Sequence, residues 1–225
     1  MIAPIFPLPN VVFFPHTYLP LHIFEPRYRT MVAEALDGDR LIVMVLAEES
    51  RTPGRMATKR GEVAPAIHPI GSVGRIEVAE PLGQGRWNIV LQGLVRVEVG
   101  RLKSGPANYF TAELEVLVDA LPDLQDPRVA ERKAAFLLTA RRYGEQVLAG
   151  EYPAELFGDA VPYPMLVNRA ASLLRVSVHR KQDLLGLGDV EERAAAVERW
   201  MTGQLASHAA IERFIGRRPS NPRLN

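Results

Sequence analysis

The spacing of hydrophobic and polar positions changes abruptly near residue 25. An apolar run from Leu19 to Phe24 has the length of a strand and ends at Glu25-Pro26. Beyond it, apolar side chains recur at helical spacing, at Tyr28, Met31, Val32, Ala35 and Leu36. This change predicts a strand that leads directly into a helix. Pro26 suits the first helical turn, where its missing N–H needs no partner.

Extended segments dominate the chain up to about residue 118. Leu41–Ala47 is a continuous apolar run, typical of a buried strand. Arg75–Ala79 and Arg86–Val99 lie on either side of a Gly-Gln-Gly turn and alternate polar with apolar residues, which predicts a hairpin. Gly93 in the second arm indicates a bulge or sharp bend, as a curling sheet needs. A further strand is predicted from Phe110 to Val118, and its apolar face comprises Ala112, Leu114, Val116 and Val118.

Helical patterns take over in the second half of the chain. Asp126 followed by Pro127 predicts an N-cap and the first residue of a helix that runs to about Tyr143. A second helix is predicted over Met165–Arg175, and a short third one is capped by Ser177. Asp189, with Glu192 three residues later, predicts the cap of a long final helix. The apolar face of that helix comprises Val190, Ala194, Val197, Met201, Leu205, Ile211 and Ile215.

These elements predict an α+β chain in two parts. Several short, bent strands with one helix favour a small barrel-like sheet over residues 1–118. The polar stretch between Glu48 and Gly71 predicts a long surface loop within that part. A composition shift at Leu121-Pro122-Asp123 marks the boundary, so an α-helical subdomain is expected over residues 119–225.

Composition narrows the functional classes. The chain has 225 residues, 47% of them hydrophobic and 24% charged, as in ordinary soluble domains. A formal net charge of +1 gives no global attraction to nucleic acid or acidic lipid. The absence of cysteine excludes disulfides, thiol catalysis and cysteine-based zinc sites. The proline-broken start of the chain predicts neither a signal peptide nor a membrane span, so a cytoplasmic protein without a membrane partner is expected.

No residue set supports enzyme chemistry, and no cofactor is expected. A phosphate-binding Walker A loop requires a Gly-Lys pair, which occurs nowhere in the chain. Lys103-Ser104 are adjacent, but they precede Gly105-Pro106 in what we predict to be a solvated turn without a nucleophile motif. The histidines lack metal-ligand spacing; they are His16, His22, His68, His179 and His208. We therefore expect no catalytic residue and no metal site.

The strand-to-helix junction holds the candidate ligand-binding residues, which are Phe24, Glu25, Arg27 and Tyr28. The charges of Glu25 and Arg27 are placed to orient the backbone of a ligand. A structural alternative stays open, in which Glu25 caps the helix, Arg27 pairs internally and Phe24 belongs to the core.

Several blocks of the sequence resemble the N-terminal, substrate-binding domain of Lon proteases. The opening block comprises Phe6-Pro7-Leu8, then Val12-Phe13-Phe14-Pro15, then the stretch from Leu19 to Tyr28. Later blocks that resemble the family are Ile70–Ile76, Asn88–Arg96, Lys181–Leu185 and Glu192-Arg193. The resemblance implies a PUA-like β-barrel followed by a helical bundle. It also implies a non-enzymatic module that binds protein or peptide, with unfolded or exposed apolar segments as the expected ligand.

Two other functions stay open at the level of sequence. RNA binding is the main alternative, because the implied PUA-like fold and the many arginines suit it; its affinity would fall steeply with salt. A hydrolase would require a cluster of perturbed carboxylates or histidines inside a pocket. The ATPase and protease motifs of complete Lon proteases are absent from this sequence, so the resemblance transfers only the binding role.

Overall fold

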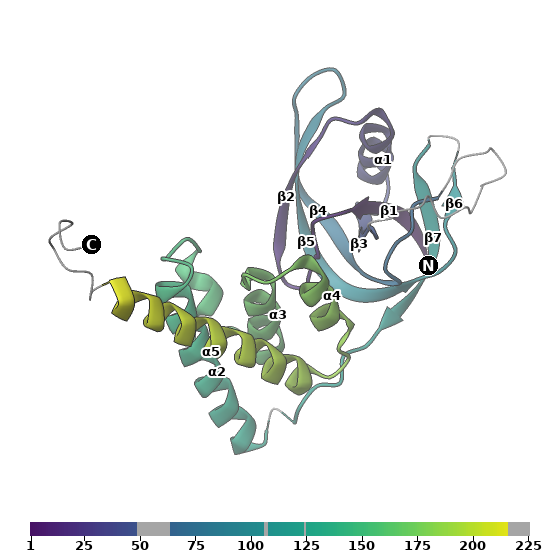
Figure 1. Cartoon of the computed structure of the whole chain (residues 1–225). Coiled ribbons are helices and arrows are strands. Elements are labelled where there is room, and N and C mark those ends of the chain that lie inside the picture. Colours follow the sequence, from purple (N-terminus) through teal and green to yellow (C-terminus); the bar gives the residue numbers. More distant parts are fainter. Residues whose placement is uncertain (49–63, 106–107, 124, 216–225) are drawn as a thin grey trace, which may run out of the picture. The chain divides into compact units, whose positions relative to one another are not determined.

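The computed structural model describes residues 1–48, 64–105, 108–123 and 125–215 (Figure 1). Most of the predicted loop between Glu48 and Gly71 lies outside these residues. The strands are β1 (Ile2–Leu8), β2 (Tyr18–Ile23), β3 (Leu41–Leu46), β4 (Ile70–Pro81), β5 (Trp87–Val99), β6 (Lys103–Ser104) and β7 (Phe110–Leu117). The helices are α1 (Pro26–Asp37), α2 (Pro127–Gln146), the 3-10 helix η1 (Ala154–Phe157), α3 (Tyr163–Leu173), α4 (Val178–Gly186) and α5 (Val190–Ile215).

The chain is α+β, as predicted, and forms two compact units. The first unit comprises Met1–Ala120 together with Ala171–Gly188, and the second comprises Leu121–Ala170 together with Asp189–Asn225. Helix α4 therefore belongs with the sheet, whereas the sequence placed everything after residue 118 in one helical part. In the described parts of the chain, no helix combines the length and the apolarity needed to cross a lipid bilayer.

The sheet of the first unit curls back on itself. Its strand order is β2-β5-β4-β3-β1-β7-β6, and β5 also pairs with β7. The pairings from β5 through β4, β3, β1 and β7 thus return to β5. Only β1 and β3 run parallel; the other described pairs are antiparallel. The register of β4 with β5 shifts between Val73 and Gly74, where Gly74 faces Gly93, which confirms the irregularity predicted at Gly93.

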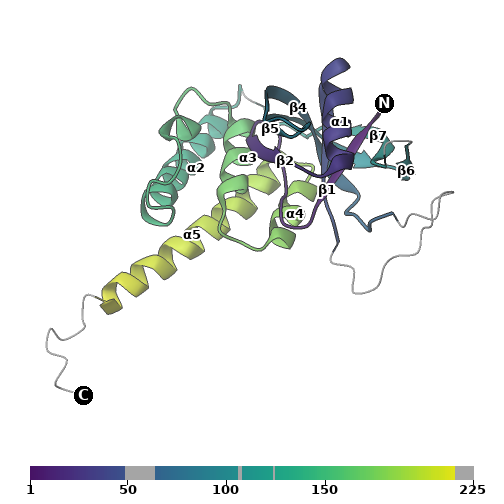
Figure 2. The same cartoon turned by 90° about the horizontal axis from the view of Figure 1, so that it is seen from above.

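Two apolar clusters form the core of this unit. Helix α1 buries Tyr28, Met31, Val32 and Ala35 against the sheet, so the helical spacing seen in the sequence is confirmed (Figures 1 and 2). Strand β3 supplies alternate residues to both clusters, Ile42 and Met44 to one and Val43 and Val45 to the other. A strand buried on both faces explains the unbroken apolar run that predicted it.

Three helix starts follow the predicted capping chemistry. The Asp126 side chain accepts a hydrogen bond from the Arg128 N–H at the start of α2. The Ser177 side chain accepts one from the Arg180 N–H at the start of α4. Asp189 Oδ1 accepts from the N–H groups of Glu191 and Glu192, at 2.7 and 3.0 Å. Each acceptor satisfies an amide that has no partner within its helix.

The second unit is built on α2 and α5. Thr139 Oγ1 donates to Glu198 Oε1 at 3.2 Å, and Tyr143 donates to Gln204 Oε1 at 2.8 Å. The predicted face of α5 is buried at Val190, Ala194, Val197, Met201 and Leu205. Ile211 departs from that prediction because it is 58% exposed. The side chain of Ile215 lies outside the described set.

Candidate functional site

The four residues predicted at the β2–α1 junction have different environments. Phe24 is 61% exposed, and its ring lies nearly parallel to that of His22, with 6.0 Å between the centroids. Phe24 is thus a surface residue. Glu25 occupies the N-cap position of α1, but its side chain makes no capping hydrogen bond. It accepts instead from Arg27, whose Nη2 lies 2.9 Å from Oε2.

Arg27 joins this surface to the buried Tyr28. The Arg27 guanidinium lies 4.5 Å from the centroid of the Tyr28 ring, within the range of a cation–π contact. The Tyr28 ring packs against Phe6 at 4.2 Å, and burial raises the pKa of its phenol. The junction therefore exposes Phe24, Glu25 and Arg27, while Tyr28 supports them from the core.

Next to Phe24, the outer face of three strands forms a groove. Strand register places Pro20 of β2 opposite Val90 of β5, and Val90 opposite Val78 of β4. The groove encloses about 370 Å³ and is lined by Pro20, Leu21, His22, Val78, Glu80, Asn88, Ile89 and Val90. We call this set the sheet groove. Its volume lies at the low end of the roughly 300–1,000 Å³ of small-molecule sites, and so suits one or two side chains.

The sheet groove is apolar along the row Pro20–Val90–Val78 and polar at the end formed by His22, Asn88 and Glu80. Val78 is 55% exposed although it is a β-branched apolar residue, and it follows a register irregularity of β4. At the polar end His22 Nδ1 lies 2.9 Å from Asn88 Oδ1, within hydrogen-bond distance. Contiguous exposed apolar surface with a polar rim is typical of an interaction site.

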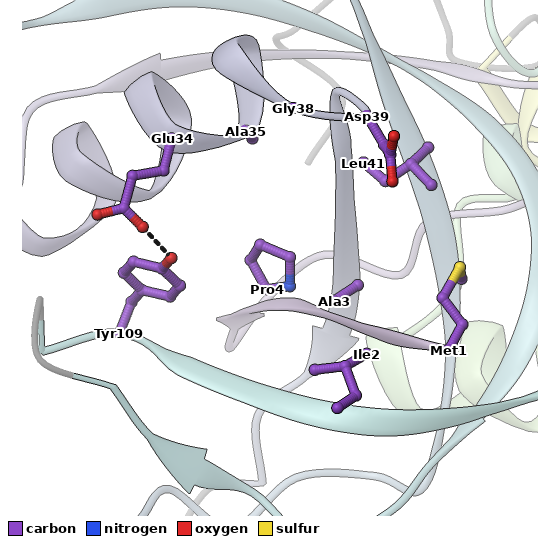
Figure 3. A pocket seen from close by; sticks show the side chains of 10 residues that line it. All are labelled: Met1, Ile2, Ala3, Pro4, Glu34, Ala35, Gly38, Asp39, Leu41 and Tyr109. Atoms are coloured by element: carbon purple, nitrogen blue, oxygen red, sulfur yellow. Dashed lines mark hydrogen bonds between the residues drawn. The ribbon is translucent and has the colours of Figure 1, made fainter.

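A second hollow of about 270 Å³ lies between the end of α1 and the edge of β1 (Figure 3). Its walls carry the carboxylates of Glu34 and Asp39, and its floor includes Ala3 and Leu41. The Tyr109 hydroxyl donates to Glu34 Oε2 across one side. Burial and this hydrogen bond raise the pKa of Tyr109 to about 12. The hollow has a fixed negative rim, but its carboxylates do not form a metal cluster.

The ionisation of Tyr109 tests this geometry. The folded state holds the Tyr109 phenol proton more tightly than the unfolded state. The protonated phenol therefore stabilises the folded state fully below the ordinary pKa of 10.0, and this stabilisation is lost as pH rises through about 12. The difference in phenolate absorbance between the wild type and Tyr109→Phe should show a midpoint near 12. Glu34→Gln should lower it. A midpoint at the ordinary value in the wild type would contradict the hydrogen bond from Tyr109 to Glu34.

The described residues hold no group of three or more histidines, aspartates or glutamates that could bind a metal ion. Lys103 and Ser104 form the short strand β6, not the predicted turn. Lys103 is exposed and lies 2.6 Å from Glu113, and this hydrogen bond lowers the pKa of the Glu113 carboxyl. The pair is thus an exposed ion pair on the sheet.

The sequence did not identify the groove residues of β4 and β5 as candidate site residues. The alternation of polar and apolar residues placed Val78 and Val90 on strands, but it did not show which face of the hairpin packs against the core. The signal that could have found the groove is the register of the strand pairs. In the hairpin Val78 lies opposite Val90, and the pairing of β2 with β5 places Pro20 opposite Val90.

Comparison with known proteins gives one consistent match. The sequence profile of the ATP-dependent protease La (LON) substrate-binding domain matches residues 2–203. The Lon protease of Flavobacterium johnsoniae is 27% identical over 209 residues, which are 90% of this chain and 24% of that protein. The Lon protease of Escherichia coli is 26% identical over 195 residues, or 84% of this chain and 23% of that protein. The chain spans about a quarter of the length of these relatives.

Solved structures share the fold. The N-terminal domain of a Mycobacterium avium complex Lon protease superposes with a TM-score of 0.66 and 17% identity, covering 90% of this chain and 98% of that one. A Lon N-terminal domain protein from Xanthomonas campestris gives 0.64 and 19% identity, covering 89% and 99%. At these identities the likeness concerns the fold alone.

Proposed function

This chain belongs to the family of substrate-binding domains of the ATP-dependent protease La (Lon), and from that membership we propose that it binds polypeptide through the sheet groove. The observation that carries the proposal is the apolar row Pro20–Val90–Val78, in which Pro20 and Val78 are exposed and Val90 is half-buried. It is held on three paired strands near the exposed ring of Phe24. The ligand is an unfolded or exposed apolar segment of another protein.

Burial of apolar surface supplies the affinity. Complete burial of one valine- or leucine-sized side chain contributes about 1.5–3 kcal/mol. One or two such contacts, less the cost of ordering the ligand, give weak binding, with dissociation constants of roughly a millimolar or higher. Weak, sequence-tolerant binding of this kind suits a module that samples many unfolded chains.

The junction residues extend this surface in the proposal. Phe24 adds an exposed apolar ring beyond His22, and the ion pair of Glu25 with Arg27 lines a hollow at the start of α1. Tyr28 holds Arg27 in place from below. The module itself is non-enzymatic, and any ATP-driven or proteolytic step on the bound chain belongs to separate domains or partners.

Two structural details belong to the same proposal. The closed cycle of strand pairings through β5, β4, β3, β1 and β7 supports the PUA-like barrel that the family resemblance implied. The hydrogen bonds between α2 and α5 support a helical bundle, and we place the boundary between the two parts near residue 118, with α4 on the barrel side.

The proposal predicts that Val78→Asp weakens polypeptide binding about tenfold or more, because it places a charge in the apolar row. The measurement is fluorescence anisotropy of labelled, reduced and carboxymethylated lactalbumin, which stays unfolded. Leu138→Asp is the matched control, since Leu138 is 62% exposed on α2 in the other unit and the charge change is the same. Equal loss in both variants, or no binding by the wild type, sinks the proposal.

The same anisotropy assay distinguishes RNA binding from polypeptide binding. Among the described residues that line the sheet groove there is no lysine or arginine, so the groove itself lacks the cations that phosphate contacts require. Labelled single-stranded RNA in place of the polypeptide should give no saturable binding. Retention that falls steeply with salt would favour the RNA alternative over the groove.

A further inference from the structure

The rows of residues on either side of the apolar row Pro20–Val90–Val78 carry different charges. One row, which forms an end of the sheet groove, comprises His22, Asn88 and Glu80, which strand register places side by side. The other row, which lies beyond the lining of the groove, comprises Tyr18, Gln92 and Arg75. The apolar row Pro20–Val90–Val78 lies between them. A ligand that crosses the apolar row therefore meets a carboxylate on one side and a guanidinium on the other.

Only the carboxylate is left without a counter-charge. Arg75 Nε donates to Glu77 at 2.7 Å, and Arg75 Nη2 donates to Gln92 at 3.1 Å, so this guanidinium is already engaged. Glu80 is exposed, and within the described part of the chain it forms no ion pair. The nearest residue in its row, Asn88, is occupied with His22. The groove thus has one uncompensated negative end.

Resting on the polypeptide-binding function proposed above, we infer that the sheet groove selects apolar segments that carry a lysine or arginine two residues from the apolar side chain. Successive residues on one face of an extended chain are two positions apart, about 6.6–6.8 Å. An extended ligand with an apolar side chain over Val90 therefore places the side chain two residues away over Glu80 and Asn88. The aliphatic stem of a lysine or arginine can follow the apolar row while its cationic end reaches Glu80.

Arg86 is the basic side chain that could compete with such a ligand. It lies two residues before Asn88 on the chain and is exposed. No ion pair joins it to Glu80 among the described residues, although its charge lowers the negative potential of this end. Removing that charge should strengthen the preference for a cationic ligand, whereas removing Glu80 should abolish it.

A pair of labelled peptides tests the inference. The peptides Ser-Val-Leu-Ser-Lys-Ser and Ser-Val-Leu-Ser-Gln-Ser differ only in the cationic side chain. We expect the lysine peptide to bind the wild type about two- to fivefold more tightly at low salt, the range of an exposed ion pair. The ratio should fall to one in Glu80→Gln and at high salt, and it should rise in Arg86→Gln.

The failures of the two proposals are distinguishable. Equal affinity for both peptides in the wild type, or a lysine preference that survives Glu80→Gln, overturns the charge selection and leaves polypeptide binding intact. If neither peptide binds, both the proposal of polypeptide binding at this groove and the inferred charge selection are refuted. Because Glu80 and Arg86 are both exposed, neither substitution should impair folding, and circular dichroism of the variants checks that.

Discussion

Gly93→Ala should destabilise the sheet unit by about 3 kcal/mol or more, the upper range for overpacking a closed interior. A Cβ atom at this position would lie 2.2 Å from the carbonyl oxygen of Phe14, which is a backbone atom and cannot rotate away. The Gly93 N–H donates to Thr17 O at 2.9 Å, and Gly93 O accepts from the His16 N–H at 2.8 Å. Strand β5 and the segment from Phe14 to Thr17 therefore cannot separate to admit the methyl group without losing both hydrogen bonds.

Denaturant unfolding followed by tryptophan fluorescence measures the loss of stability in the sheet unit. The chain has two tryptophans, Trp87 on β5 and Trp200 on α5. In a Trp200→Phe background, the fluorescence of Trp87 reports on the sheet unit alone. Gly186→Ala is the control, because no atom lies within 4 Å of its added Cβ, and its stability should change by no more than about 1 kcal/mol. Equal midpoints for Gly93→Ala and the control would contradict the close approach.

Arg96→Met should cost about 3 kcal/mol, the lower end of the range for breaking a buried ion pair. Arg96 is 3% exposed, its Nε donates to Asp119 Oδ1 at 2.7 Å, and its Nη1 donates to Leu185 O at 3.0 Å. Methionine fills most of the volume but removes the guanidinium that faces Asp119 and the donor to Leu185 O. The cost stays at the lower end because the Asp119 side chain is 19% exposed.

The same substitution should loosen α4 selectively. This helix is held to the sheet by Arg96 at Leu185 O and by Gln182, whose Nε2 donates to Ile70 O at 2.8 Å. Hydrogen exchange of the α4 amides should accelerate more than that of β3. Arg101→Met, at an exposed arginine, should change stability by less than about 0.5 kcal/mol. Uniform acceleration across the unit would show that Arg96 acts on the whole sheet instead.

Local signals in the sequence accounted for much of the fold. The strand-to-helix change at Glu25, the caps at Asp126, Ser177 and Asp189, and the bend at Gly93 depend on nearby residues, and all are present. Strand β1 was missed because Pro4 and Pro7 argue against a paired strand; it pairs with β3 and β7 nonetheless. Val116 and Val118 were predicted on the apolar face of the strand that starts at Phe110, but they are 49% and 86% exposed, and β7 ends at Leu117.

Features that depend on distant pairing could not be predicted. The attachment of α4 to the sheet rests on Arg96 and Gln182, whose partners lie 89 and 112 residues away in sequence. The sheet groove likewise exists only because β2 pairs with β5 in one register. Of the predicted site residues, Phe24 is exposed as a ligand contact requires, whereas Tyr28 is buried among Phe6 and the α1 core.

Chemical-shift mapping of the backbone amides tests the central claim most directly. The wild-type protein is titrated with the peptide Ser-Val-Leu-Ser-Lys-Ser. Binding at the sheet groove predicts that the largest saturable shifts fall on Leu21, His22, Val78, Asn88 and Val90. Shifts confined to α2 and α5 or to the hollow around Tyr109, or no saturable shift at all, would contradict polypeptide binding at this surface.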